Sequence, residues 1–170
     1  MTQVWQNGKI VPVTIIKAEP NTVSFVRTSE KDGYSAVQLK NSTAKREFRT
    51  KNPEELGQTI DVASFKEGDV VKIVGTSKGR GFQGVVKRYG FGGGPKSHGQ
   101  KNRMRAPGSI GSTAPQRVVP GRRMAGRMGT DRITVKNLKV VSIDVEKNQL
   151  FLKGAVPGAP QGLILIETVK

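Results

Sequence analysis

The sequence predicts a mainly β protein, a closed or nearly closed barrel, that carries a long basic loop rich in glycine and proline. Short segments rich in Val and Ile recur along the chain, turn signals separate them, and no long helical periodicity appears. Closure into a barrel would remove the exposed edges that such strands otherwise present. The expected strands are Val11–Lys17, Thr22–Arg27, Tyr34–Leu39, Val70–Val74, Ile133–Val145, Gln149–Lys153 and Leu163–Ile166.

Turn residues and alternation set the bounds of these strands. Val13 and Ile15 alternate with Thr14, and apolar and polar residues also alternate over 140–145, which is the period of a strand with one buried face. One short helical turn is expected at 53–56, with Asn52 as its cap and Pro53 at its first position. The turn signals are Pro20-Asn21, Asp32-Gly33, Lys66-Glu67-Gly68 and Lys147-Asn148.

The stretch from Gly75 to Arg132 differs in composition from the rest of the chain. It holds 13 of the 29 Lys and Arg residues, 14 of the 21 glycines and four of the nine prolines, but a single acid, Asp131. Its net charge is +12, whereas the remaining residues together carry +4. Such a segment stays compact only beside a dense polyanion. Because residues 88–124 show little alternation, they are predicted to be an inserted extended loop, with 1–87 and 125–170 as the barrel body.

Length and composition limit the class of protein. A chain of 170 residues with a pI near 10.5 is one basic domain whose partner is nucleic acid or an anionic membrane surface. No run of about 18 apolar residues exists, and the glycines prevent a basic amphipathic helix, so a membrane partner is not expected. The absence of cysteine excludes disulfides and Cys-ligated zinc. Met1–Lys9 lacks the apolar core of a signal peptide, so a soluble cytoplasmic protein is expected.

The basic residues of the stretch are predicted to contact nucleic acid. A solvated surface loop is the alternative, but thirteen cations against one anion is not a typical solvated surface. Nine of the thirteen are arginines, which favours bidentate phosphate contacts and stacking on bases. They form three groups: Lys78, Arg80, Lys87 and Arg88; then Lys96, Lys101, Arg103 and Arg105; then Arg117, Arg122, Arg123, Arg127 and Arg132.

Three aromatic residues and one histidine lie among these groups. Phe82, Tyr89 and Phe91 could stack on unpaired bases. The alternative is packing onto the barrel body, which is favoured for Phe82 and left open for Tyr89. His98 is the single histidine and has neither a cysteine nor a nearby carboxylate, so an RNA contact or a plain loop role is expected rather than metal binding or catalysis.

The segment Gly79–Gly84 fits the G-x-G-x-x-G pattern of dinucleotide sites, but its context is wrong. The pattern requires a following helix, whereas the next residues run into Gly90 and a glycine triplet, so no helix is expected there. The next acid is Asp131, much further on than the ribose-binding acid of such sites, and its expected role is to pair with Arg132 or cap a turn. No catalytic grouping is present, so neither an enzyme nor a cofactor is predicted.

A family resemblance extends over nearly the whole chain. GTSKGRGFQG at Gly75–Gly84, SHG at Ser97–Gly99, RAPGSIG at Arg105–Gly111 and PGRRMAGRMG at Pro120–Gly129 follow one another in the order seen in bacterial large-subunit ribosomal protein three. The chain resembles this universal L-three family also at DGYSAVQL (Asp32–Leu39), GQTIDVASFKEGDVVKIVG (Gly57–Gly75), ITVKNLKVVSID (Ile133–Asp144) and KGAVPG (Lys153–Gly158).

The resemblance implies a translation-factor-type β-barrel and a structural role in the large ribosomal subunit. It implies binding to 23S-type rRNA, support of early subunit assembly, and neighbouring large-subunit proteins as partners, without homo-oligomers. The loop would penetrate toward the peptidyl transferase centre, with its tip around Ala106 to Pro120 and rRNA contacts through the basic groups, Tyr89 and His98. The only ions implied are structural Mg²⁺ held by the rRNA. The location implied is the ribosome in the cytoplasm.

The chain departs from the family pattern in three places. A short strand that family members carry before the Met-Thr pair is expected to be absent, so the sequence does not decide whether the barrel closes at that edge. A helical insertion is expected to be missing as well, because only Lys40 to Arg46 connects the DGY strand to Glu47-Phe48-Arg49. Some members carry a methylated glutamine after GSIG, but Gln116 is not a secure counterpart and no modification is predicted.

Overall fold

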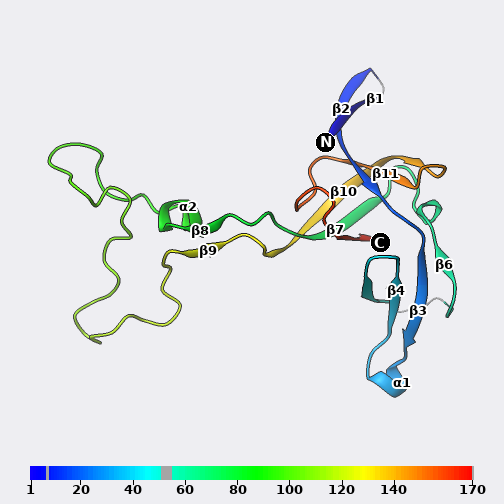
Figure 1. Cartoon of the computed structure of the whole chain (residues 1–170), viewed down its shortest axis with the longest axis horizontal. Coiled ribbons are helices and arrows are strands. Elements are labelled where there is room, and N and C mark those ends of the chain that lie inside the picture. Colours follow the sequence, from blue (N-terminus) through cyan, green and yellow to red (C-terminus); the bar gives the residue numbers. More distant parts are fainter. Residues whose placement is uncertain (7, 51–54, 170) are drawn as a thin grey trace. The chain divides into compact units, whose positions relative to one another are not determined.

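The computed structural model describes residues 1–6, 8–50 and 55–169. Strands account for 42% and helices for 7% of the structure, which confirms the mainly β class. The chain forms two compact units. Unit 1 comprises Met1–Val74, Thr134–Val156 and Ile164–Lys170, and unit 2 comprises Gly75–Ile133 and Pro157–Leu163. Figure 1 labels most of the strands and the helices α1 and α2.

A six-stranded sheet, in the order β1-β2-β11-β10-β7-β12, forms much of unit 1. Both hydrogen-bonded neighbours of β2 are antiparallel to it, with Trp5 opposite Ile10 on β1 and Leu150 opposite Ile16 on β11. Strands β7 and β10 run on into unit 2. The strands are β1 (Thr2–Gln6), β2 (Lys9–Lys17), β7 (Val70–Thr76), β10 (Arg132–Asp144), β11 (Gln149–Lys153) and β12 (Ile164–Thr168).

Side chains two residues apart on this sheet form the main hydrophobic core. Val71 and Ile73 of β7, and Leu150 and Leu152 of β11, have no exposed surface. Their spacing follows from the strand period of two, which directs alternate side chains to one face. The same cluster contains Ile16, Val140 and Val62, the last from the 3₁₀ turn η1 (Val62–Ser64).

A four-stranded sheet, in the order β5-β4-β3-β6, completes the regular structure of unit 1. Its strands are β3 (Asn21–Arg27), β4 (Ala36–Lys40), β5 (Lys45–Arg49) and β6 (Thr59–Ile60), and the one-turn helix α1 (Ser29–Asp32) connects β3 to β4. Val23, Ala36 and Val37 are its buried side chains.

Charged and aromatic side chains form a network on this second sheet. The Arg27 guanidinium donates from Nη1 to Asp32 Oδ1 at 2.6 Å and from Nε to Glu47 Oε2 at 3.2 Å. It also lies 5.6 Å from the centre of the Tyr34 ring, over which Arg49 lies at 5.3 Å. The pKa of Glu47 is lowered, first by a hydrogen bond from Tyr34 and then by Arg27. The same hydrogen bond raises the pKa of Tyr34.

A tight turn occupies the place where the family resemblance implies that a helical insertion is missing. Strands β4 and β5 are antiparallel, and Lys40 pairs directly with Lys45. The Asn41 N–H donates to the Ala44 carbonyl at 3.1 Å, and Asn41 Oδ1 accepts from the N–H groups of Thr43 and Ala44 at 3.0 and 2.7 Å. This Asx-type arrangement closes the hairpin with its own side chain.

All seven expected strands are present, each within two residues of its predicted bounds, as β2, β3, β4, β7, β10, β11 and β12. The sheet pairing, however, does not close. Within the described residues, β1 and β12 are the two ends of the six-stranded sheet and do not pair with each other. The structure therefore confirms the mainly β class but contains open sheets rather than a closed barrel. The helical turn expected at 53–56 falls mostly outside the described residues.

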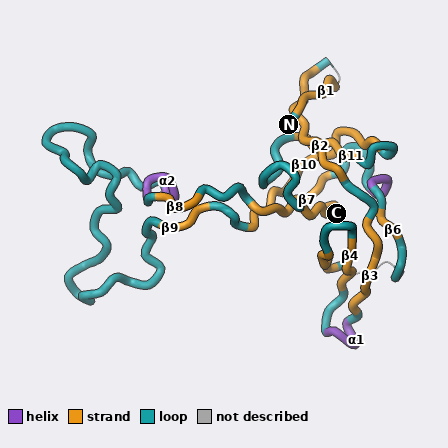
Figure 2. Tube along the Cα trace, in the orientation of Figure 1, coloured by secondary structure: helices purple, strands orange, loops and turns teal. Residues whose placement is uncertain are grey.

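Unit 2 consists of a short ribbon, one short helix and a long irregular loop. Figure 2 shows the stretch between α2 and β9 as continuous loop. Its main segment, Gly75–Ile133, matches the highly charged stretch of the sequence almost residue for residue. The predicted inserted loop, 88–124, lies entirely within it. The segment Pro157–Leu163 also belongs to unit 2, and a Cβ at Gly158 would lie 2.9 Å from the Thr76 carbonyl oxygen.

Candidate nucleic-acid interface

Unit 2 begins and ends in a two-stranded antiparallel ribbon. Strand β8 (Gly81–Gln83) pairs with β9 (Gly126–Met128), with Phe82 opposite Arg127. The Ser77 N–H donates to the Asp131 carbonyl at 2.9 Å, and the Asp131 N–H donates to Ser77 Oγ at 3.1 Å. Asp131 thus joins the two limbs through its backbone.

Gly129 explains how closely the two limbs of the ribbon approach. Its φ is +82°, and a Cβ there would clash with the Lys78 carbonyl oxygen. Any other side chain here would have to adopt the left-handed conformation and would overlap the opposite limb, so the position favours glycine. A glycine at this position therefore allows the returning limb to lie against the outgoing one.

A five-residue helix, α2 (Val85–Tyr89), follows the G-x-G-x-x-G segment, so the expectation that no helix forms there is wrong. The Arg88 N–H donates to the Gly84 carbonyl at 2.9 Å, and the helix ends at Gly90, whose φ is +73°. Val85 is only 3% exposed. Burial of the Val85 side chain outweighs the modest helix propensity of valine. The sequence pattern alone does not reveal that this side chain is buried. The acid that a dinucleotide site needs about 20 residues on is still missing.

Arg88 holds the two limbs together beyond the ribbon. Its Nη1 donates to the carbonyl oxygen of Met124, 36 residues away, at 2.8 Å. The guanidinium also lies against Gly126, where a Cβ would come within 2.7 Å of Nη1. The side chain is therefore engaged within the protein. Its predicted rRNA contact stays a prediction, to be made by the remaining N–H groups.

Tyr89 packs with other residues of unit 2 and keeps 36% of its surface exposed. The guanidinium of Arg88 lies 4.9 Å from the centre of its ring and that of Arg123 lies 5.5 Å away. The Phe91 ring is 6.1 Å distant and tilted by 43°. These contacts form an aromatic and guanidinium cluster at the root of the loop.

Phe82 differs from its predicted environment. The packing favoured for it is wrong, because the side chain is 77% exposed on the ribbon. Its Cα partner across the ribbon is Arg127, whose guanidinium donates to Thr130 Oγ1 at 2.6 and 3.2 Å. An exposed aromatic ring beside cations is typical of nucleic-acid surfaces.

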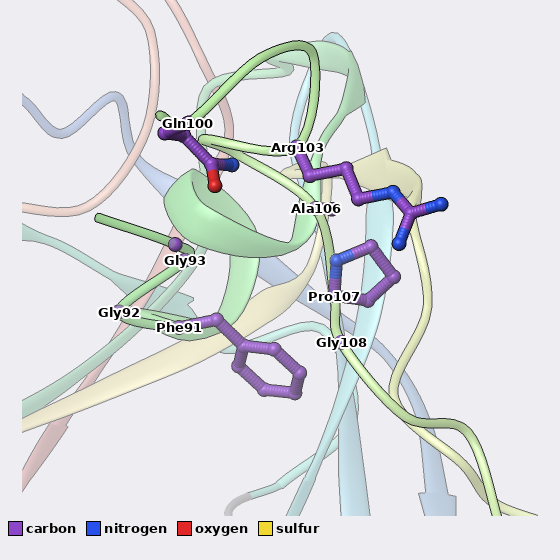
Figure 3. A pocket seen from close by; sticks show the side chains of 9 residues that line it. Phe91, Gly92, Gly93, Gln100, Arg103, Ala106, Pro107 and Gly108 are labelled. Carbon is purple, nitrogen blue, oxygen red and sulfur yellow. The ribbon is translucent and has the colours of Figure 1, made fainter. Parts of the chain in front are cut away.

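Two hydrogen bonds, one between backbone groups and one from a side chain, close parts of the loop beyond α2. The Gly94 N–H donates to the Met104 carbonyl at 2.9 Å, which closes the segment between them into a small loop. Further along, Arg122 donates from Nη2 to the Ser109 carbonyl. A hollow lies beside the segment that the Gly94–Met104 hydrogen bond closes, and its lining includes Phe91, Gln100 and Arg103 (Figure 3).

Charges in unit 2 are not balanced within the protein. The five ion pairs between described residues, those of Lys17, Arg27 (two), Lys72 and Lys147, all lie in unit 1. None of the thirteen basic side chains of unit 2 forms an ion pair with a described carboxylate. Twelve of the thirteen are exposed, and Arg88 is half-buried.

The predicted site residues divide by what their side chains do. Arg88, Arg122 and Arg127 donate hydrogen bonds within the protein, and Arg123 lies over Tyr89. The others make no ion pair or side-chain hydrogen bond in the described part of the chain, and all of them are exposed. These are Lys78, Arg80, Lys87, Lys96, His98, Lys101, Arg103, Arg105, Arg117 and Arg132.

Sequence reasoning missed some features of this surface. Phe91 and Gln100 line the same hollow, although the sequence indicates only stacking for Phe91 and no role for Gln100. The glycine triplet at 92–94 is the one sequence signal for it, because consecutive glycines permit a tight closure. No pattern in the sequence predicts that Pro157–Leu163 belongs to unit 2.

Other classes of site gain no support from the geometry. The described residues contain no group of three or more His, Asp or Glu side chains placed to hold a metal ion. Among them, no helix is long and apolar enough to span a membrane. His98 is exposed and adopts a φ of 58°, which is compatible with a plain loop residue.

Comparisons with known proteins identify the family. A family model described as ribosomal protein L3 matches residues 36–153. The large ribosomal subunit protein uL3 of Herpetosiphon aurantiacus is 47% identical over 192 positions, covering 98% of this chain and 91% of that protein. The proteins of the same name from Streptococcus mutans and Bacillus mycoides are 45% and 43% identical, with 99% and 98% of this chain covered and 92% and 91% of theirs.

The alignments also bear on the predicted shortening. The 192 aligned positions exceed the 170 residues of the chain, so these relatives carry internal residues that this chain lacks. The extra positions in the relatives agree with the predicted absence of an insertion from this chain. The location of that insertion before Glu47 stays a prediction. On the family match and these identities, the chain belongs to the ribosomal protein L3 family and is a structural, non-enzymatic constituent of the ribosome.

Proposed function

We propose that the chain binds large-subunit rRNA chiefly through unit 2, supports early subunit assembly, and organises rRNA near the peptidyl transferase centre through residues 88–124. One observation carries this proposal. Unit 2 holds thirteen basic residues and one acid, and none of the thirteen forms an ion pair with a described carboxylate. Charges left uncompensated at this density favour a polyanionic partner.

The mechanism is counterion release combined with fixed geometry. Each Lys or Arg that meets a phosphate frees a condensed cation from the RNA, so binding weakens steeply as salt rises. Exposed residues whose side chains make no ion pair or hydrogen bond with a described residue, such as Lys96, Lys101 and Arg117, would supply this free energy of counterion release. Arg88 and Arg122 would instead hold the loop in a shape that presents the others, because their guanidinium groups bind backbone carbonyls.

Unit 1 would act as the anchor of the loop. Its buried core gives it stability of its own, whereas the loop has few buried side chains and gains order from its partner. Any effect on peptide-bond formation would be indirect, through the position of rRNA. Neighbouring large-subunit proteins, a cytoplasmic location, and Mg²⁺ held by the rRNA rather than by the chain complete the proposal.

Sedimentation tests the placement. We expect a tagged copy of the chain expressed in bacteria to sediment with large subunits at ordinary salt and to be released only by high-salt washing. A chain that stays at the top of the gradient while the subunits are intact contradicts the proposal.

Deletion of Lys96–Val119 tests the division of labour. Unit 1 should keep its cooperative unfolding transition, because its core residues lie outside the deletion. Subunits should then accumulate as assembly intermediates. If the deletion abolishes the unfolding transition of unit 1, the loop is part of its core and the proposed division is wrong.

A further inference from the structure

A shallow hollow of about 440 Å³, open to solvent, lies within the loop of unit 2. Its walls come from the start of the loop at Phe91, the glycine triplet, and the segment 103–108. In Figure 3 the rings of Phe91 and Pro107 lie on one side of the hollow, and Gln100 lies across from them. The size is within the range of small-ligand sites, roughly 300–1,000 Å³.

Two glycines allow the hollow to form. Gly93 has a φ of +72°, and a Cβ there would clash with the Met104 carbonyl oxygen. A Cβ at Gly94 would lie 2.9 Å from Gln100 Nε2 and 3.1 Å from the Arg103 carbonyl oxygen. Because side chains at these positions would push the two walls apart, the glycines and the Gly94–Met104 hydrogen bond define the shape of the hollow.

The walls offer one aromatic face and several donors, without any carboxylate. Phe91 and Pro107 provide apolar rings, while the Gln100 amide and the Arg103 guanidinium provide hydrogen-bond donors. Arg103 makes no ion pair with a described residue and is exposed, so its donors are available to a ligand. A flat, polar-edged ring system matches this combination, because it needs stacking on its face and donors at its edge.

Phe91 connects this hollow to a second, smaller one. The same side chain lines a depression of about 280 Å³ together with Gly121, Arg122 and Arg123. The two guanidinium groups make this second depression suited to a phosphate. Phe91 thus lines both a hollow of base size and a depression that contains two arginines, a combination suited to a nucleotide contact.

We propose that the larger hollow binds one unpaired nucleobase of the large-subunit rRNA, stacked on Phe91, with Gln100 and Arg103 donating to its edge. The inference rests on the proposed rRNA-binding function and goes beyond it, because it assigns base contact rather than phosphate contact to three named residues. The surrounding cations, Lys101 and Arg105 among them, would hold the adjoining backbone.

A phosphate is the rival occupant of the larger hollow. It would use Arg103 but would leave the aromatic ring and the prolyl ring without a partner, since neither binds an anion. A base uses all of these walls. Stacking on one aromatic side chain contributes about 1–3 kcal/mol per base, a factor of about five or more in the binding constant.

The test is chemical probing of rRNA in large subunits from cells whose only copy of the protein is this chain or a variant. Dimethyl sulfate and a carbodiimide together read the base-pairing edges of all four nucleobases. In Phe91→Leu subunits, which keep the apolar volume beside Tyr89, we expect the reactivity of one unpaired base to rise about fivefold or more. Gln100→Ala should expose the same base, and Phe91→Tyr should leave it protected.

The matched control is Lys31→Ala, which removes an exposed cation of unit 1, away from the residues that line the hollow and outside the proposed rRNA-binding unit. It should leave base reactivity unchanged. Normal base reactivity in both Phe91→Leu and Gln100→Ala subunits overturns the inference, and so does a change confined to hydroxyl-radical cleavage of the backbone, which indicates a phosphate. Absence of the unaltered chain from large subunits is a different failure, that of the proposed function.

Discussion

In unit 1, the carboxylate of Glu47 receives hydrogen bonds from Arg27 and Tyr34, and Asp32 binds the same guanidinium. In unit 2, thirteen basic side chains share one acid, and Asp131 joins the limbs through its backbone. The difference is that ion pairs form within unit 1 but not among the described residues of unit 2, whose charges we propose meet rRNA. Unit 2, the region without these ion pairs, is the one that by our proposal binds rRNA.

The two units differ in the same way in their apolar side chains. Ile73, Leu150 and Leu152 of unit 1 have no exposed surface, whereas Val118, Val119 and Ile110 of unit 2 are each more than a third exposed. Unit 1 therefore has a core of its own. Unit 2 relies on hydrogen bonds such as that of Arg88 with Met124 and, by our proposal, on rRNA.

The largest expected effect is on the core of unit 1. Ile73→Ala should lower the free energy of unfolding by about 2–5 kcal/mol, because it removes buried methyl groups and leaves a cavity. Val118→Ala in unit 2 should change it by less than about 0.5 kcal/mol, as for most exposed positions. Urea unfolding followed by circular dichroism measures both, and equal effects would remove the contrast between the units.

Charge removal should act on RNA affinity and not on stability. Replacing Lys96, Lys101, Arg105 and Arg117 by alanine should reduce the slope of log affinity against log salt by about 3–4, at about 0.9 per phosphate contact. The matched control replaces four exposed lysines of unit 1, namely Lys9, Lys31, Lys136 and Lys153. Filter binding to large-subunit rRNA fragments at several salt concentrations gives both slopes. A similar reduction of the slope in the two variants would contradict the assignment of rRNA binding to unit 2.

Arg88 should behave differently from its neighbour Lys87. Arg88→Ala removes a charged donor from the Met124 carbonyl, a hydrogen bond of a type that contributes about 1.5–3 kcal/mol when buried and less at this half-buried position. Hydrogen exchange should accelerate about tenfold in α2 and β9. Lys87→Ala, on the same helix but exposed, should leave exchange unchanged. Equal acceleration of exchange in the two variants would show that Arg88 does not join the limbs.

The smallest effect concerns the pH dependence of unit 1. The pKa of Glu47 lies below its ordinary value of 4.5, so its ionised form favours the folded state. That stabilisation is present above about pH 4.5 and is lost as the pH falls through the lowered pKa. Glu47→Gln should therefore be less stable than the unaltered chain near pH 6, with the gap narrowing below pH 4.5. Tyr34→Phe removes the hydrogen bond that lowers the pKa of Glu47 most, so in its background Glu47→Gln should cost less stability near pH 6. A stability loss from Glu47→Gln that does not depend on pH would exclude this linkage.

The strands that the sequence predicted are those in which apolar residues gather or alternate, such as β7 and β11. The missed strands β1 and β5 are too polar to stand out, and pairing with β2 and β4 determines them instead. Strands β8 and β9 have three residues each, one of which is a glycine in each strand, and they form only because distant segments meet.

The candidate site was predictable as a region but not side chain by side chain. Composition alone delimits Gly75–Arg132, because charge and glycine content both change at its ends. Whether a given arginine is engaged depends on groups far along the chain, as with Arg88 and Met124, 36 residues apart. The hollow beside Phe91 depends likewise on how the loop closes between Gly94 and Met104.

The Asn41–Ala44 turn is useful in another respect. Hydrogen bonds between Asn41, Thr43 and Ala44 close β4 onto β5, the Ser42 hydroxyl donates to Glu19 Oε2 at 2.9 Å, and Ser42 and Thr43 are exposed. Exposed turns of this kind accept inserted sequence with little strain on the strands they connect. An affinity tag or a fluorescent reporter placed between Ser42 and Thr43 would lie in unit 1, outside the basic unit, and would provide a handle for isolating or tracking particles that contain this chain.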